Sequence, residues 1–329
     1  MPPRMRLVFC GTPQFAVPTL KYLLAQPDRE VLAVITQPDR PRGRGQEVAF
    51  SPVKEAALAA RIPVQQPEKI RAPEVQRLLE ELAPDVIVII AYGQIIPAQM
   101  LSISKYGWIN LHASLLPKYR GAAPINWALA NGETRTGLTT MRIDAGMDTG
   151  EVLLQRELAI GPAETAPELS ARMSEIGAPL MEETLQGLAT GSIVPRPQNQ
   201  SEATLAPILK KEDGRIDWNR PAQEIYNRIR GFAPWPGAFT TFRGQTCHVS
   251  GEPVTNPNFT VQFPGQANTV PGTLLVGKDG LFVFCGTRTV LRVQSVKLEG
   301  RKPVGGADFA NGARLKPGER FGDTSFARI

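Results

Sequence analysis

Apolar runs alternate with amphipathic stretches along the first half of the chain. Residues 6–10 (RLVFC) form a short apolar run that stops at Gly11, and the following FAVPTLKYLLA has helical spacing. Strand-like runs return at 31–36 and 85–91, separated by the helical patterns VKEAALAARI and PEVQRLLEELA. Strands that alternate with helices pair in parallel, and the uninterrupted run VIVII indicates cover on both faces. The pattern predicts an α/β fold with an open, doubly wound, mostly parallel sheet of the Rossmann-like type.

The pattern changes after an irregular stretch at 188–207, which lacks periodicity and carries Gly, Pro, Ser and Asn. One amphipathic helix in PAQEIYNRIRGF then precedes the short strand-like runs AFTTF, TCHVS, GTLLVG, GLFVFC and TVLRVQSV. Short strands separated by Gly and Asp turns are typical of a small closed or partly closed β-barrel, here OB-like. We therefore expect an α/β domain over 1–187, a linker over 188–207 and a barrel domain over 208–329.

Composition places this fold in a cytoplasmic setting. The 329 residues are 42% hydrophobic, enough for two cores, yet the longest apolar stretch, 86–91, is too short for a membrane helix. The amino-terminal segment lacks the long apolar region of a secretion signal. Three distant cysteines without a C-x-x-C pair fit reduced thiols better than disulfides or zinc: Cys10, Cys247 and Cys285. We expect a protein without a bound metal.

The positive charge is concentrated in the last third of the chain. Residues 208–329 contain 17 Lys and Arg against 10 Asp and Glu, a net charge of +7, whereas residues 1–207 carry −1. A basic region beside a neutral one suggests a polyanionic partner, most often a nucleic acid. A solvated basic face that aids solubility is the alternative, and charge alone does not choose between them.

Loops at the carboxyl ends of the predicted parallel strands are where ligands bind in such sheets. The loops after Cys10, Thr36, Ala91 and Leu111 should therefore share one crevice. The first of them reads GTPQF and not G-x-G-x-x-G, which argues against a nicotinamide-dependent dehydrogenase.

The loop after Thr36 is unusually basic. In QPDRPRGRGQE, Arg40, Arg42 and Arg44 alternate with Pro and Gly, so the segment cannot be a regular helix or a central strand. Three guanidinium groups near a crevice suggest a binding role, with an ordinary exposed loop as the alternative.

The strongest candidate chemistry lies in GWINLHASLLPKYRGAAPINWAL. If WINL is a strand, Asn110 and His112 point to the same side at its carboxyl end. Imidazole can hold or move a proton near pH 7, and an amide donor can stabilise an oxyanion, so the pair suits attack on a carbonyl. A carboxylate could orient the imidazole or accept a proton from an attacking amine. Asp148 in RIDAGMDTGEVL is our candidate, and Asp144 in the same turn competes with it.

Five motifs together carry a family resemblance that runs almost from end to end: FCGTPQFAVP, VITQPDRPRGRG, VIVIIAYGQIIP, INLHASLLPKYRGAAPI and IDAGMDTGEVL. RIDW and RIRGFAPWPGAF continue it beyond 207. The chain resembles the methionyl-tRNA formyltransferase family. The resemblance implies an amino-terminal domain that binds 10-formyltetrahydrofolate as co-substrate and a carboxyl-terminal barrel that helps to bind tRNA.

The resemblance also implies site residues. The catalytic trio would be Asn110, His112 and Asp148. The folate pocket would be shaped by two runs: Ser114, Leu115, Leu116 and Pro117, and Ala91, Tyr92 and Gly93. The arginine loop, with Arg40, Arg42 and Arg44, would contact the acceptor end of the tRNA.

The implied reaction moves the formyl group to the α-amine of methionyl initiator tRNA, for translation initiation, in a monomeric enzyme of the bacterial cytoplasm. The alternative hypotheses for the function are a formyltransferase acting on a sugar amine or on glycinamide ribonucleotide, the hydrolase domain of formyltetrahydrofolate dehydrogenase, and a non-catalytic RNA-binding relative. The basic last third and the arginine loop argue against the enzymatic rivals, and the intact trio argues against the last.

Overall fold

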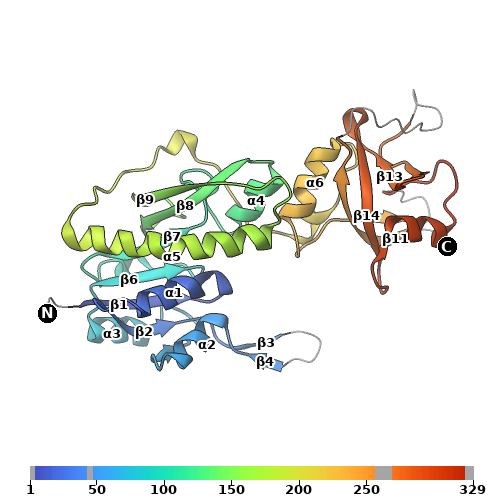
Figure 1. Ribbon diagram of the computed structural model, residues 1–329. Helices are drawn as coiled ribbons and strands as arrows, with labels where there is room; N and C mark the ends of the chain where they lie inside the picture. Colours follow the sequence, from blue (N-terminus) through green and yellow to red (C-terminus); the bar gives the residue numbers. More distant parts are fainter. Residues whose placement is uncertain (1–3, 43–46, 256–268, 323–329) are drawn as a thin grey trace. The chain divides into compact units, whose positions relative to one another are not determined.

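The structure is a computed structural model that describes residues 4–42, 47–255 and 269–322 (Figure 1). Chain contacts divide it into two compact units. Unit 1 contains Met1–Ile125, Arg135–Ile160 and Glu168–Pro207. Unit 2 contains Asn126–Thr134, Gly161–Pro167 and Ile208–Ile329. Residues 188–207 thus fall within unit 1.

Unit 1 is built on one seven-stranded sheet with the order β5-β2-β1-β6-β7-β8-β9. Its first five strands run parallel: β5 (Val64–Gln65), β2 (Arg29–Ile35), β1 (Met5–Gly11), β6 (Val86–Ile90) and β7 (Trp108–His112). Strand β8 (Arg135–Arg142) pairs antiparallel with β7, and β9 (Val152–Ala159) pairs antiparallel with β8. The predicted mostly parallel, doubly wound sheet is confirmed.

Helices α1 (Val17–Leu24), α2 (Pro52–Ala59) and α3 (Pro73–Leu82) and the short 3-10 turns η1 (Gln14–Ala16) and η2 (Ala98–Met100) lie between these strands in the chain. The long helix α5 (Ala166–Thr190) and the turn η3 (Gln200–Glu202) follow β9. Their starts follow local rules. The Ser51 hydroxyl accepts a hydrogen bond from the Lys54 amide at 3.1 Å, and Pro52 occupies the first position of α2, where its missing N–H costs nothing.

Both faces of the sheet are covered. One face places Val8, Ile87 and Trp108 in a buried cluster with Val75 and Leu79 of α3. On the other face α5 packs closely against β7 and β8. A Cβ at Gly177 of α5 would lie 2.5 Å from Leu111 Cδ2. A side chain at Gly177 would therefore force Leu111 to shift.

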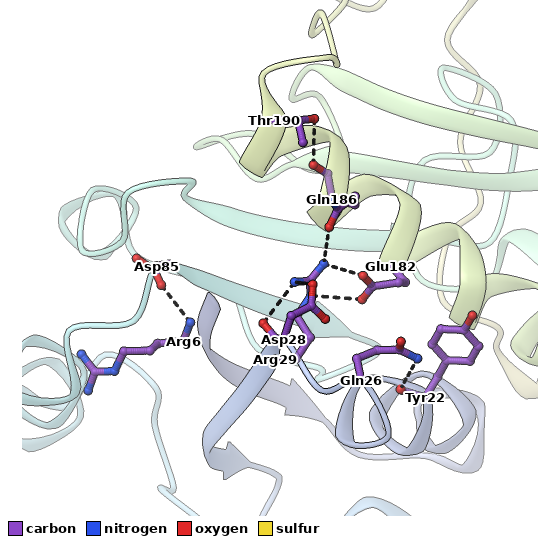
Figure 2. A network of polar contacts seen from close by, with 9 residues as sticks. All are labelled: Arg6, Tyr22, Gln26, Asp28, Arg29, Asp85, Glu182, Gln186 and Thr190. Atoms are coloured by element: carbon purple, nitrogen blue, oxygen red, sulfur yellow. Dashed lines mark hydrogen bonds and ion pairs between the residues drawn. The ribbon is translucent and has the colours of Figure 1, made fainter. Parts of the chain in front are cut away.

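A polar network ties β2 to α5 inside unit 1 (Figure 2). The Arg29 side chain is only 3% exposed, and its guanidinium contacts Asp28 at 2.8 Å and Glu182 of α5 through two hydrogen bonds. A further bond from Arg29 reaches Gln186 at 3.2 Å. Burial raises the pKa of Glu182, and the charge of Arg29 opposes that rise.

Unit 2 contains a six-stranded antiparallel sheet. Its strands are β10 (Phe239–Phe242), β11 (Gln245–Pro253), β12 (Leu274–Gly277), β13 (Gly280–Phe284), β14 (Val290–Leu298) and β15 (Val304–Gly305). The order is β10-β11-β14-β13-β12, and β15 pairs with β14. Within the described part of the chain, β10 and β12 therefore lie at the two ends of this strand order. The predicted small β domain after the α/β domain is confirmed, with an antiparallel sheet as its frame.

Helices α6 (Ala222–Gly231) and α7 (Gly306–Ala313) and the turns η4 (Lys211–Gly214) and η5 (Gly286–Arg288) complete the carboxyl-terminal part of unit 2. Trp218 of the RIDW motif stacks on Phe321 at a ring distance of 5.6 Å within its core.

Two earlier segments also belong to unit 2. Trp127, in α4 (Pro124–Ala130), meets Phe232 edge to face at 5.3 Å. The buried Arg230 guanidinium donates to the carbonyls of Gly161 and Glu164, each at 3.1 Å. These contacts explain why 126–134 and 161–167 pack with α6.

None of the helices in the described ranges is both long and apolar enough to cross a membrane. Within the same ranges, His, Cys, Asp and Glu form no group of three or more that could hold a metal ion. The three cysteines are buried free thiols.

Candidate active site

The loops after three neighbouring strands meet at the carboxyl edge of the sheet in unit 1. The Tyr92 carbonyl, after β6, accepts hydrogen bonds from Thr12 Oγ1 at 3.3 Å and from Gln37 Nε2 at 3.0 Å. Thr12 follows β1 and Gln37 follows β2. Three of the four loops that were expected to share a crevice therefore contact one another.

Strand β7 presents Asn110 and His112 on one face. Alternation along the strand puts them on the side of Trp108, whose indole Nε1 donates to the Met100 carbonyl at 2.8 Å. Asn110 pairs in register with Ile89 of β6, and His112 with Thr139 of β8. Asn110 is half-buried and His112 is 6% exposed. Both side chains thus stand at the strand end, next to the loop that follows β6.

His112 is held by one ring nitrogen and faces a carboxylate with the other. Its Nε2 lies 2.9 Å from the Tyr119 carbonyl oxygen. A carbonyl only accepts, so this nitrogen carries a proton. Its Nδ1 lies 3.6 Å from Asp148 Oδ2, beyond ordinary hydrogen-bond length. Nδ1 is therefore the nitrogen at which the ring can gain or lose a proton facing Asp148.

The turn 144–150 separates the roles of the two competing carboxylates. Asp148 Oδ2 accepts a hydrogen bond from the Gly121 amide at 2.8 Å and faces His112. Asp144 is exposed, and its Oδ1 accepts from Gly146 N at 3.0 Å and from Thr149 Oγ1 at 2.7 Å. The structure brings Asp148 to the imidazole, whereas Asp144 closes its own turn.

Backbone strain gathers around these groups. Three residues without glycine's freedom have left-handed φ angles: Ala91 at 47°, Tyr119 at 61° and Asp148 at 53°. Such conformations cost about 1–3 kcal/mol each and cluster at functional sites. The strain falls on the loops that carry the candidate residues.

Side chains of β8 and β9 donate hydrogen bonds to the backbone of the run from Ser114 to Pro117. Thr139 Oγ1 donates to the Ser114 carbonyl at 2.7 Å, and Gln155 Nε2 donates to the Leu116 carbonyl at 2.9 Å. Ser114 is fully buried and its hydroxyl donates to Lys118 O, and the Leu116 side chain is buried. Leu115 and Pro117 keep partly exposed side chains.

The run from Ala91 to Gly93 exposes its two small residues. Tyr92 between them is 2% exposed and belongs to the core beneath the sheet edge. Burial raises the pKa of its phenol, with a smaller contribution from Cys10. Ala91 and Gly93 therefore present backbone at the surface, while Tyr92 anchors the loop.

The arginine loop is a two-stranded hairpin at the level of the backbone, with β3 (Arg40–Arg42) paired to β4 (Glu47–Ala49). Arg40 is exposed. Arg44 lies outside the described residues, and so does the side chain of Arg42. At the base of the hairpin, Lys54 forms an ion pair with Asp39, which also accepts from Gln66 at 2.9 Å.

Two residues of the irregular stretch 188–207 were not predicted to lie near the trio. Gln198 and Thr204 lie in the irregular stretch after α5, yet their side chains bond to the loops that carry Asp148 and Tyr119. An irregular segment has no periodicity that predicts its partners, so nothing local indicated these contacts.

Comparison with known families defines the class. The model described as "Formyl transferase" matches residues 5–185, and that described as "Formyl transferase, C-terminal domain" matches residues 208–314. The chain carries both parts of a two-domain formyl transferase.

Curated relatives refine the class. A protein of Solibacter usitatus is 55% identical over 97% of this chain and 99% of its own length. Proteins of Koribacter versatilis and Geobacter metallireducens are 52% and 48% identical, covering 98% and 97% of this chain and 100% and 99% of their own lengths. All three are named methionyl-tRNA formyltransferase. The chain belongs to the methionyl-tRNA formyltransferase family.

Solved structures share the fold at low sequence identity. WlaRD, a sugar 3N-formyl transferase, matches with a TM-score of 0.63 and 18% identity over 91% of this chain and 99% of its own. HypX from Aquifex aeolicus, in complex with tetrahydrofolic acid, gives 0.59 and 17% over 93% of this chain and 47% of its own. The fold alone therefore does not separate sugar from tRNA acceptors.

Proposed function

We propose that this protein transfers the formyl group of 10-formyltetrahydrofolate to the α-amine of methionyl initiator tRNA. The observation that carries the proposal is the approach of His112 to Asp148 beside Asn110 at the end of β7. The family membership supplies the substrates, since the close full-length relatives bear that name. No metal or redox group is needed for transfer of an already activated formyl group between two nitrogens.

In this reaction the neutral amine attacks the formyl carbon, a tetrahedral oxyanion forms, and the bond to N10 of the folate breaks. Asn110 would donate its side-chain amide to the oxyanion, which typically contributes about 10²–10³ in rate. Asp148, directly or through a water, would take the proton that the amine loses.

His112 contributes through Nδ1. With Nε2 committed to the Tyr119 carbonyl, only a protonated Nδ1 can donate to the oxyanion or to the departing N10. Asp148 Oδ2 faces this nitrogen at 3.6 Å and would orient the ring during the reaction. The two groups therefore act as one proton-handling pair.

The folate donor would lie against the two loops that flank β7. The exposed backbone of Ala91 and Gly93 offers hydrogen-bonding groups, and the partly exposed Leu115 and Pro117 offer apolar surface. A planar heterocycle with polar edges needs both. Ser114, Leu116 and Tyr92 would support these loops from within.

The tRNA would be held by two basic regions. In unit 2, Lys211 and Lys297 are exposed and both lower the pKa of His248, so positive charge gathers there. Such a patch would bind phosphates with a salt-dependent affinity and little sequence preference. The arginine loop, with Arg40, Arg42 and Arg44, would meet the acceptor end.

The boundaries at 187 and 207, the monomeric state and a bacterial cytoplasmic location stay predictions. A monomer would suit an enzyme that works on one charged tRNA at a time.

The test is an incubation with 10-formyltetrahydrofolate and methionine-charged initiator tRNA, with charged elongator tRNA in parallel, followed by measurement of N-formylmethionine. We expect preferential formylation of the initiator. Asp148→Asn should lower kcat by about 10²–10⁴ at saturating substrates. Asp144→Asn is the matched control, because it keeps the acceptor that closes the turn, and should retain activity. Equal activity of the wild type and Asp148→Asn would refute the catalytic assignment.

A further inference from the structure

The stretch that follows α5 forms part of the active-site framework in unit 1. Arg196 exchanges two backbone hydrogen bonds with Val152 at the start of β9, at 2.8 and 2.9 Å. Eight residues later, Thr204 O accepts from the Arg120 amide at 2.9 Å, and Ala206 N donates to Arg120 O at 2.7 Å. The chain from 196 to 206 thus joins the loop after β7 to the start of β9.

Gln198 lies at the centre of this stretch and uses both ends of its amide. Its Nε2 donates to the carbonyls of Asp148 and Gly150, each at 2.8 Å. Its Oε1 accepts from Arg120 Nε at 3.0 Å and from Arg120 Nη2 at 2.6 Å. One side chain therefore connects the turn that carries Asp148 with the loop that carries Arg120.

Arg120 is a buried anchor, only 6% exposed. Its remaining nitrogen, Nη1, donates to Gln200 Oε1 at 2.8 Å, so all three guanidinium nitrogens bond to the two amides of the 196–206 stretch. A buried guanidinium keeps its position only while its hydrogen bonds are satisfied. Gln198 accepts two of these hydrogen bonds and so helps to set the orientation of the Arg120 loop.

The same two loops hold the catalytic pair. On either side of Arg120, the Tyr119 carbonyl contacts His112 Nε2 at 2.9 Å and the Gly121 amide donates to Asp148 Oδ2 at 2.8 Å. Thr204 Oγ1 accepts from the Tyr119 amide at 2.8 Å. A shift of either loop would change the 3.6 Å separation of Nδ1 and Oδ2.

We propose that Gln198 is a positioning residue for formyl transfer, which fixes the Asp148 carboxylate relative to His112 by clasping the 144–150 turn to the 117–123 loop. The proposal rests on the proposed function and adds a residue that acts through Asp148 without touching the substrate. Because misplacing a reacting group by about 1 Å can cost ~10²-fold in rate, the effect is large although the residue is remote from the reaction.

Two variants of Gln198 and one control variant test its positioning role. Gln198→Glu keeps an acceptor for Arg120 but replaces the donor that holds the Asp148 and Gly150 carbonyls. Gln198→Ala removes both functions. Asn199→Ala is the matched control in the same stretch, because the exposed Asn199 side chain forms its hydrogen bonds among the described residues within its own turn, with Ser201 and Glu202.

We expect Gln198→Glu and Gln198→Ala to lower kcat by about 10- to 100-fold while KM for the folate donor and for tRNA changes less than about threefold. Asn199→Ala should match the wild type. Circular dichroism and melting curves identify a variant that is unfolded; Gln198→Glu, which retains the Arg120 bonds, then carries the test. A rise in KM with unchanged kcat would overturn the proposal.

A double-mutant cycle separates positioning from general structural support. If Gln198 acts through the carboxylate, Gln198→Glu in an Asp148→Asn background should lower kcat by less than about twofold further. Losses that multiply in full would overturn the proposal.

Hydrogen exchange gives a readout that does not depend on turnover. The amide of Gly121, which donates to Asp148 Oδ2, should exchange faster in Gln198→Glu than in the wild type or in Asn199→Ala. Unchanged exchange would refute the clasp. An inactive wild type with this exchange difference intact would instead refute only the proposed function.

Discussion

Removing Arg29 should destabilise unit 1 strongly, because it leaves Glu182 without its partner inside the molecule (Figure 2). Breaking one partner out of a buried pair costs about 3–5 kcal/mol. Arg29 is 3% exposed, but Glu182 keeps 17% of its side chain exposed, so we expect Arg29→Met to cost about 3 kcal/mol, the lower end of that range. For a unit of this size, that lowers the melting temperature by roughly 6–12 °C.

The pH dependence of this cost has a definite sign. In the wild type, burial raises the pKa of Glu182 and Arg29 opposes it. Without Arg29 the folded-state pKa should rise further above the unfolded value of about 4.5. Below that unfolded value the carboxyl is protonated in both states and Arg29→Met costs least. The loss should grow as pH rises from the wild-type pKa of Glu182 toward its higher pKa in the variant and then level off, so it should be larger at pH 8 than at pH 5.

Calorimetry of the full chain, with hydrogen exchange of peptides from β2 and α5, measures the effect in unit 1. The matched control is Arg156→Met, because Arg156 pairs with the next residue of α5, Glu183, at 2.8 Å with both side chains exposed (39% and 51%). It should cost no more than about 1 kcal/mol. Adding Glu182→Met to Arg29→Met should restore most of the stability. Equal losses in Arg29→Met and Arg156→Met, or no recovery in the double variant, would refute this reasoning.

Two further predictions concern the second unit and the active-site loop. Burial, Lys297 and Lys211 lower the pKa of His248 below its ordinary 6.5, so its contribution to stability is present above pH 6.5 and lost as pH falls below it. His248→Gln should reduce the fall in melting temperature that the wild type shows as pH drops below 6.5. An unchanged dependence of melting temperature on pH would contradict the assignment. At Gly121, with φ of 119°, an added Cβ would lie 2.7 Å from the Ala206 carbonyl oxygen. Gly121→Ala should therefore lower kcat about 10-fold or more in the formylation assay, and wild-type kcat would show that the loop tolerates the shift.

The sequence predicted the parts of the site that depend on local periodicity. The apolar run before Ala91 and the alternation in WINLH place loop ends and side chains by rules that hold within one strand. Those rules put Asn110 and His112 on one face, as the structure has them. They also predicted the doubly wound sheet, whose β1 and β6 are buried on both sides.

The remaining features depend on partners far away in the chain. Sequence alone left Asp148 and Asp144 in competition, because only the folded position of Gly121 and His112 distinguishes them. Gln198 lies 50 residues from Asp148 in an irregular stretch, and no local sequence pattern predicts such a contact. The membership of 126–134 in unit 2 depends in the same way on α6, about 100 residues later.

That late partnership has a consequence for synthesis on the ribosome. Trp127 leaves the exit tunnel long before Phe232, against which its ring packs. At about 5–20 residues per second, the segment around Trp127 waits roughly 5–20 s for α6 to be made. During that interval its apolar side chains lack their final cover. The nascent chain should therefore be most dependent on chaperones between the emergence of Trp127 and that of α6.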